Sequence, residues 1–152
     1  MSRKRAIDSQ MVDSMAQNML TLLPLARKRL LRLDLIQKEH QMPFSHLQVL
    51  ALLHLHESLS VSEISRRLGI AKPNITPLVD RLYEAGYVSR QHDVQDRRVV
   101  NIALEPAGRK KLEQIRADLS VHIQEQLGTL SAADCRELSS SISSMVRILD
   151  LI

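Results

Sequence analysis

Apolar residues recur along most of the chain at intervals of three and four positions, which is the period of an amphipathic helix. Pro24 lies inside the first of these segments and is expected to kink or split it, because the proline ring blocks one backbone hydrogen bond. The chain is therefore expected to be mainly helical, with helices over about 9–38, 106–127 and 132–152 and a short, mostly buried helix over about 45–56.

Two shorter helices are predicted between residues 60 and 86. Ser60 and Glu63 match an S-x-x-E capping box, in which each side chain satisfies a free backbone N–H at the start of a helix. Gly69 suits the left-handed conformation that ends such a helix. The second helix is expected over 72–85, and its apolar stripe consists of Ile75, Leu78, Val79 and Leu82.

The period then changes from 3.6 to 2, which is typical of strands with one buried face. Strands are predicted over 87–91 and 99–104, and the polar segment 92–98 between them is expected to be an exposed hairpin loop. Two short helices followed by a β-hairpin describe a winged helix-turn-helix, which places its second helix in the major groove of DNA and its hairpin tip on the flanking backbone or minor groove.

The face of the second helix opposite the apolar stripe carries the residues suited to this task. Asn and Thr can meet base edges, while Lys and Arg suit phosphates or guanine. If the helix starts near Lys72, Pro77 removes one hydrogen bond, whereas with Asn74 as the cap Pro77 falls in the first turn. The candidate DNA contacts on this helix are Lys72, Pro73, Asn74, Thr76, Pro77 and Arg81.

This region resembles the MarR (multiple-antibiotic-resistance regulator) family of transcription factors. The helix-turn-helix matches over VSEISRRLGIAKPNITPLVDRL at 61–82, and the hairpin matches the family's D-R-R motif, apolar strand and following L-T-x-x-G over DRRVVNIAL at 96–104 and PAG at 106–108. Two positions depart from the pattern. Gln95 stands where many members carry another arginine, and Glu105 replaces the usual threonine.

The resemblance implies that Arg98 enters the minor groove, that Asp96 braces it and that Arg97 lies beside it in the wing. It also implies a homodimer, joined by its N- and C-terminal helices, that binds an inverted-repeat operator on double-stranded DNA. We therefore expect a transcriptional repressor released by a small-molecule effector whose pocket the sequence does not identify. The expected organisation is a single chain over 1–152, with a winged helix-turn-helix lobe at 44–104 and dimerisation helices at 8–38 and 106–152.

Composition and the absence of certain motifs limit the possible partners, cofactors and activities of the chain. The chain has 152 residues and a formal net charge of +4, which permits an anionic partner without requiring one. One cysteine excludes a multi-cysteine metal site, and His54 and His56, two apart on a helix, cannot share an ion, so no metal and no cofactor are expected. Without a signal peptide, membrane span, phosphate loop or nucleophile motif, a cytoplasmic non-enzyme is predicted. The alternative is a winged helix that serves as a protein-interaction or scaffolding module without DNA binding.

Overall fold

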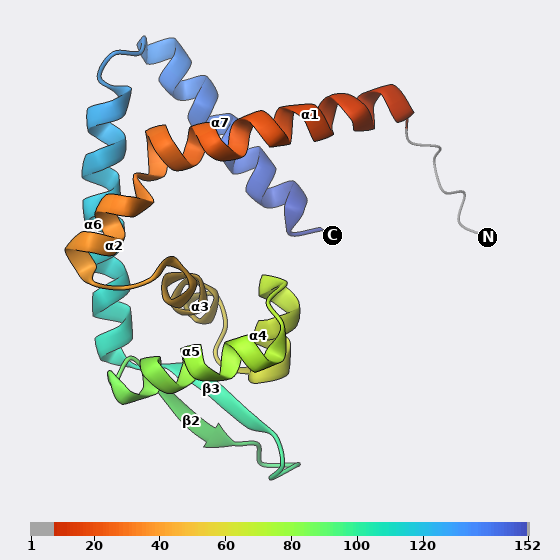
Figure 1. Ribbon diagram of the computed structural model, residues 1–152, viewed down its shortest axis with the longest axis vertical. Coiled ribbons are helices and arrows are strands. Elements are labelled where there is room, and N and C mark those ends of the chain that lie inside the picture. Colours follow the sequence, from red (N-terminus) through yellow and green to blue (C-terminus); the bar gives the residue numbers. More distant parts are fainter. Residues whose placement is uncertain (1–7, 152) are drawn as a thin grey trace. The chain divides into compact units, whose positions relative to one another are not determined.

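The computed structural model describes residues 8–151, which form helices and one small sheet (Figure 1). This confirms the expected fold class, mainly α with a small β-hairpin. The elements in chain order are α1 (Ser9–Leu25), the π-helical segment η1 (Ala26–Leu31), α2 (Leu33–His40), α3 (Phe44–His54), β1 (Leu59–Ser60), α4 (Val61–Leu68), α5 (Lys72–Glu84), β2 (Val88–His92), β3 (Val100–Leu104), α6 (Pro106–Leu127) and α7 (Ala132–Leu149).

The chain divides into two compact units. One unit is Arg32–Leu119, and the other joins the two ends of the chain, up to Leu31 and from Ser120 onward. The first unit contains the helix-turn-helix, the sheet and the first part of α6. The second contains α1, η1, the last part of α6 and α7.

The sheet has the strand order β1-β3-β2, and both pairings are antiparallel. The alternation predicted for the second hairpin strand is confirmed, since Ile102 and Leu104 are buried while Asn101 and Ala103 are partly exposed. Strand β1 was not expected, because two residues are too few to show a period. Leu59 pairs with Ile102, so β1 ties the start of α4 to the hairpin.

The hydrophobic core of the Arg32–Leu119 unit draws side chains from all its helices and from the sheet. Its largest fully buried members are Leu50, Leu53, Ile64, Ile75, Leu82, Ile102, Val49, Val79 and Val88. Burial of one such side chain stabilises the fold by roughly 1.5–3 kcal/mol. Three of them come from α5, so that helix is held firmly by one face while its opposite face stays in solvent.

Gly108 allows α6 to approach the hairpin closely. A Cβ at this position would lie 2.2 Å from the carbonyl oxygen of Tyr87 and 2.8 Å from Cδ1 of Leu104. Both distances are far inside van der Waals contact, and one of the atoms is backbone. Any larger residue at 108 therefore forces α6 and the sheet apart.

The long N-terminal helix is split, but not where Pro24 predicted. Helix α1 continues past Pro24 to Leu25 and then widens into η1. The break falls at Arg32, which has a left-handed backbone with φ 41° between η1 and α2. A π-helix spaces its hydrogen bonds five residues apart, so the irregularity is absorbed over a full turn after the proline.

The unit that joins the chain ends exposes much of its apolar surface. Neither α1 nor α7 contains a buried residue within the described part of the chain. The most exposed large apolar side chains of these helices and the residues next to them are Leu20, Leu151, Val146, Leu23 and Met15, each at least 59% exposed. Within residues 8–151, no helix combines the length and the apolar character needed to cross a membrane.

Candidate nucleic-acid interface

Helix α5 presents its polar face to solvent. Ile75, Val79 and Leu82 are at most 1% exposed, and they fix the rotation of the helix about its own axis. All six candidate residues predicted on the opposite face are exposed, namely Lys72, Pro73, Asn74, Thr76, Pro77 and Arg81. Figure 1 shows α5 lying beside β2 and β3.

The start of α5 is at Lys72 rather than Asn74. The carbonyl oxygen of Ala71 accepts hydrogen bonds from the backbone N–H groups of Asn74 at 2.8 Å and Ile75 at 3.3 Å, and Ala71 offers no side-chain cap. Pro77 therefore lies inside the helix, where it cannot donate to the carbonyl of Pro73 four residues earlier. Because Pro73 is exposed, water can reach that carbonyl.

The end of α5 leads directly into the hairpin through glycine. Gly86 has φ 73°, its N–H donates to the carbonyl of Tyr83 at 2.9 Å, and the N–H of Tyr87 donates to the carbonyl of Leu82 at 2.9 Å. These two bonds form a Schellman motif, which satisfies carbonyls at a helix end. The predicted end of the helix at Gly86 is confirmed, and strand β2 follows at Val88.

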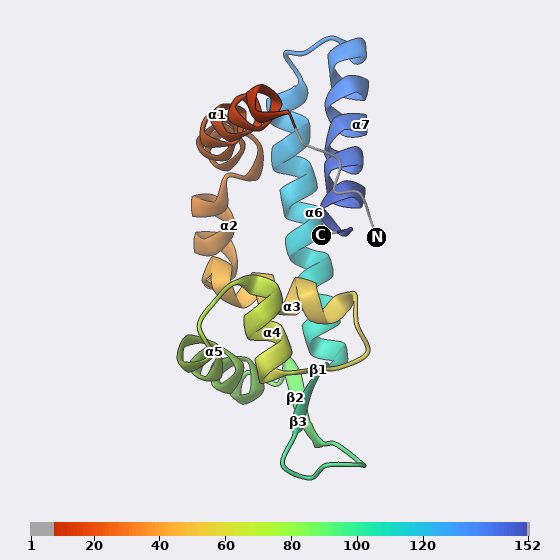
Figure 2. The same cartoon turned by 90° about the vertical axis from the view of Figure 1, so that its right-hand side faces the viewer.

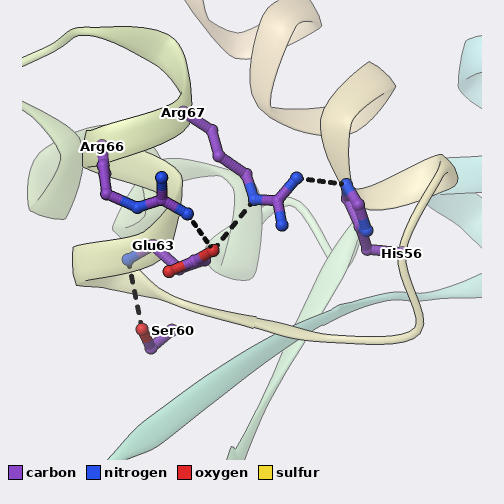
Figure 3. A network of polar contacts seen from close by, with 5 residues as sticks. All are labelled: His56, Ser60, Glu63, Arg66 and Arg67. Carbon is purple, nitrogen blue, oxygen red and sulfur yellow. Dashed lines mark hydrogen bonds and ion pairs between the residues drawn. The ribbon is translucent and has the colours of Figure 1, made fainter. Parts of the chain in front are cut away.

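Helix α4 forms the first half of the helix-turn-helix. The N–H of Glu63 donates to Ser60 Oγ at 3.2 Å, and Gly69 ends the helix with φ 64°. The second half of the predicted capping box is wrong, because the Glu63 carboxylate is engaged elsewhere. Arg66 Nη2 donates to Glu63 Oε1 at 2.7 Å, and Arg67 Nε donates to the same oxygen at 3.0 Å (Figure 3).

These contacts hold the pKa of Glu63 below its usual value, with the hydrogen bond from Arg66 as the largest cause and that from Arg67 next. Arg67 also places Nη1 at 3.1 Å from Nε2 of His56, which follows α3 (Figure 3). One carboxylate thus keeps two arginines on the surface of α4. Arg67 also links α4 to the end of α3.

The tip of the hairpin is organised by Asp93. Its Oδ1 accepts hydrogen bonds from the backbone N–H groups of Gln95 at 2.8 Å and Asp96 at 3.1 Å, and its Oδ2 accepts from Asn101 Nδ2 at 3.2 Å. Hydrogen bonding, first from Asp96 and then from Gln95, lowers the pKa of Asp93. The sequence reading assigned Asp93 no role, although an Asp at the start of a loop is a common backbone acceptor.

The predicted wing residues lie at the far end of this loop. Asp96 Oδ1 accepts a hydrogen bond from the backbone N–H of Arg98 at 3.0 Å and lies 3.8 Å from Arg98 Nε. The Arg98 side chain is 95% exposed, and Arg97 is exposed beside it. Asp96 therefore orients the backbone at Arg98 while the guanidinium extends into solvent. Figure 2 shows the hairpin tip projecting beyond α4 and α5.

A hollow of about 470 Å³ lies where α4, α5 and the wing meet. It brings together residues from both parts of the motif, with Lys72 and Arg98 as its charged members. The remaining lining residues are Ser60, Val61, Ser62, Thr76, Val99 and Val100, so the lining contains three hydroxyls and no carboxylate. Two cations and several hydroxyls around one hollow are suited to an anion with oxygen acceptors.

Arg90 of β2 connects the hairpin to α5. Its Nη2 pairs with the carboxylate of Asp80, and its guanidinium carbon lies 5.1 Å from the centre of the Tyr83 ring, within the range of a cation–π contact. Asp80 and Tyr83 both belong to α5. No local spacing in the sequence indicates this contact, because it depends on how the strand folds back against the helix.

His46 of α3 lies buried, with 6% of its surface exposed. Burial lowers its pKa from the ordinary value, and the positive charge of Arg81 on α5 lowers it further. Both effects favour the neutral form of this imidazole.

Comparisons with known proteins agree with this geometry. The model of the MarR family matches residues 44–100, which contain the helix-turn-helix and most of the hairpin. The uncharacterized HTH-type transcriptional regulator YfiV of Bacillus subtilis is 30% identical over 109 residues, covering 72% of this chain and 68% of YfiV. The HTH-type transcriptional repressor MdtR of the same organism is 36% identical over 85 residues, covering 56% of this chain and 54% of MdtR, about half its length.

Solved structures share the fold. A mutant of MepR from S. aureus bound to an oligodeoxyribonucleotide superposes with a TM-score of 0.62 at 20% identity, covering 88% of this chain and 97% of that chain. Its low identity makes it evidence for the fold alone. The family model and the YfiV match, together with this shared fold, show that this chain belongs to the MarR family of HTH-type transcriptional regulators.

Proposed function

We propose that this protein binds duplex DNA by placing α5 in the major groove and the tip of the β2–β3 hairpin on the neighbouring backbone or minor groove. The observation that carries the proposal is the hollow lined by Lys72 and Arg98, because it joins the recognition helix to the wing and contains no carboxylate. A DNA phosphate there would meet two cations and the hydroxyls of Ser62 and Thr76. A MepR mutant of the same fold is bound to an oligodeoxyribonucleotide, which supports DNA as the partner.

Base readout falls to the exposed residues in the first turns of α5. Asn74 can contact adenine through its amide, Thr76 can donate or accept at either base, and Pro73 and Pro77 offer apolar contact to thymine methyl groups. Arg81 lies further along the helix and suits a phosphate or guanine. Arg98, with Arg97 beside it and Asp96 orienting its backbone, suits a narrow A·T-rich minor groove, where negative potential is concentrated.

The protein acts in this proposal as a homodimer. The apolar surface of α1 and α7 supports this, because exposed apolar patches of this extent mark protein interfaces. The dimerisation helices are those of 8–38 and 106–152, and the winged lobe is 44–104. Two copies would place their α5 helices about 34 Å apart on an inverted repeat, one turn of DNA.

The regulator is proposed to act as a repressor, as its relative MdtR is named, and to be released from its operator by a small-molecule effector. The effector follows from the family resemblance. A repressor and its operator form a reversible complex, so a ligand that binds the free form better than the DNA-bound form shifts the balance towards release.

The DNA test compares two variants by fluorescence anisotropy on a duplex from the region upstream of the protein's own gene. We expect Arg98→Ala to weaken binding about 10- to 150-fold, since a charge-assisted contact is worth roughly 1.5–3 kcal/mol. The slope of log K against log salt should become shallower by about 0.9, as loss of one phosphate contact requires. Arg136→Ala removes an exposed arginine outside the winged lobe and, where sedimentation velocity shows that the variant keeps the dimer, should leave both values unchanged.

A wild-type protein that ignores duplex DNA at 50 mM salt would refute the proposal. It would favour the alternative, a winged helix used as a protein-interaction or scaffolding module. Equal binding by wild type and Arg98→Ala would instead remove Arg98 from the interface and leave the helix contacts to be tested.

The dimer is tested by sedimentation velocity. Leu20→Glu places a charge on α1 at a side chain 77% exposed, and we expect it to convert the dimer to monomer. Val94→Glu makes the same change at a side chain 99% exposed on the hairpin loop and should leave the dimer intact. A wild-type monomer at micromolar concentration would contradict this part of the proposal.

A further inference from the structure

Three side chains with metal-binding atoms converge between α2 and α6. Glu39 and His40 are the last two residues of α2, and Asp118 lies on α6. One ligand atom from each lies within 4.8 Å of the other two. All three belong to the Arg32–Leu119 unit, so their arrangement is internal to one compact body.

His40 has a buried nitrogen whose hydrogen-bonding capacity is not used. Its side chain is 8% exposed, and Nε2 lies 2.9 Å from Asp118 Oδ2. This contact is within ion-pair distance, but Nε2 makes no hydrogen bond to Asp118 or to any other described group. Buried polar atoms are nearly always hydrogen-bonded, so a buried nitrogen that faces a carboxylate without a hydrogen bond requires an explanation.

We propose that Glu39, His40 and Asp118 form a binding site for a divalent transition-metal ion of the zinc type. Such ions accept imidazole nitrogen and carboxylate oxygen together, at about 2.0–2.2 Å from the metal. Ligand atoms around a tetrahedral ion then lie about 3.4 Å apart, so small side-chain rotations bring the three groups into place. Calcium and magnesium prefer sites made of oxygen alone, which makes the buried imidazole the selective ligand.

The charges favour the same occupant. Two carboxylates bring two negative charges to the site, and a divalent cation neutralises them. The ion also gives the buried His40 Nε2, which makes no hydrogen bond, a coordinate bond. Three protein ligands leave one position of a tetrahedral ion open to water.

An ion at this position would fasten the end of α2 to α6. Ile36 of α2 and Ile115 of α6 belong to the same core cluster as Ile75 and Val79 of α5. Metal binding would therefore stabilise the unit that carries the recognition helix, because a ligand that binds only the folded state raises its stability.

The sequence reading expected no metal because it searched for pairs of ligands on one helix. Here the ligands come from helices far apart in the chain, and only the packing of α2 against α6 unites them. Two neighbouring residues, Glu39 and His40, do not form a recognisable metal motif by themselves.

The test is zinc binding by the full-length protein without an affinity tag. Competition with a chromophoric chelator gives the stoichiometry and the dissociation constant, and cobalt substitution gives a visible spectrum that reports nitrogen and oxygen ligands. We expect one ion per chain, a rise in melting temperature on adding zinc, and at least a tenfold loss of affinity in His40→Gln and in Asp118→Asn. His54→Gln, which changes an exposed histidine of α3, should bind zinc like the wild type.

A wild-type protein that binds no zinc at tens of micromolar would overturn the proposal, and so would His40→Gln with unchanged affinity and stoichiometry. Circular dichroism identifies a variant that fails to fold. In that case the zinc affinity of Glu39→Gln, which changes an exposed ligand, is compared with that of the wild type instead. No step of this test uses DNA, so its failure leaves the proposed DNA-binding function untouched.

Discussion

Arg90 offers a test of whether DNA affinity depends on the wing being fixed to the recognition helix. Its guanidinium pairs with Asp80 and lies over the ring of Tyr83, so one strand residue makes two contacts with α5. Arg90→Ala removes both contacts and leaves the predicted DNA-facing residues in place.

The size of the effect follows from the exposure of the partners. The side chains of Arg90 and Asp80 are 37% and 45% exposed, and such ion pairs contribute about 0–1 kcal/mol. A cation–π contact at a comparably exposed site adds about 0.5–1 kcal/mol. Arg90→Ala is therefore expected to reduce the free energy of unfolding by about 0.5–2 kcal/mol.

If the same contacts hold the wing in the orientation that DNA requires, freeing it should weaken DNA binding by a similar free energy, about 2- to 30-fold. The salt slope separates this role from a direct phosphate contact. A positioning residue leaves the slope unchanged, whereas loss of a phosphate contact makes it shallower by about 0.9. Anisotropy titrations at several salt concentrations measure both quantities.

Asp80→Asn gives the sharpest comparison, because the two explanations predict opposite signs. Removal of a carboxylate from a DNA-binding helix should strengthen the attraction to phosphates. If Asp80 acts by holding Arg90 and the wing, the same change should weaken binding. Tighter binding by Asp80→Asn, or unchanged binding by Arg90→Ala, would refute the positioning argument.

Two further predictions concern the scaffold. Gly108→Ala should lower the free energy of unfolding by about 1–3 kcal/mol, because the new Cβ meets the Tyr87 carbonyl. Urea denaturation measures this free energy. The control is Gly128→Ala, whose new Cβ has its nearest contact at 3.4 Å and should change the free energy of unfolding little. His46 has a lowered pKa in the folded protein, so the unfolded chain binds more protons than the folded protein below about pH 6.5. The free energy of unfolding should therefore fall as the pH drops from 7.5 to 5.5. The fall is at most about 1.4 kcal/mol per pH unit, the limit for one titrating group. Melting curves of His46→Gln should show a weaker dependence than the wild type, and equal slopes would contradict the argument.

The sequence predicted well those features that depend on neighbours within one or two turns. The apolar stripe of α5, the left-handed end at Gly69 and the Ser60 cap all depend on local spacing, and the structure confirms each of them. The capping box is confirmed only in part, because the Glu63 carboxylate pairs with Arg66 and Arg67 and not with the backbone N–H of Ser60. Hydrogen bonds from arginine compete with the backbone N–H for the same carboxylate, and the S-x-x-E motif does not show which of them forms.

Contacts between distant residues stayed beyond prediction. The pairing of Arg90 with Asp80 and the approach of His40 to Asp118 arise only when strands and helices pack. The break at Arg32 was missed for a related reason. A proline marks where a hydrogen bond is lost, but a π-turn can move the resulting irregularity several residues along the helix.

The interface separates two kinds of residue, and this separation has a consequence for mutation. Lys72 and Arg98 are exposed and bury little apolar surface, so substitutions there should change DNA affinity with little change in stability. Gly108 and Ile75 set the position of the hairpin and of α5, so substitutions there should reduce stability and affinity together. Arg90 lies between these classes, because its modest stabilising contacts join the helix to the wing. A plot of affinity against stability across such variants should therefore show two branches, with the positioning residue on neither.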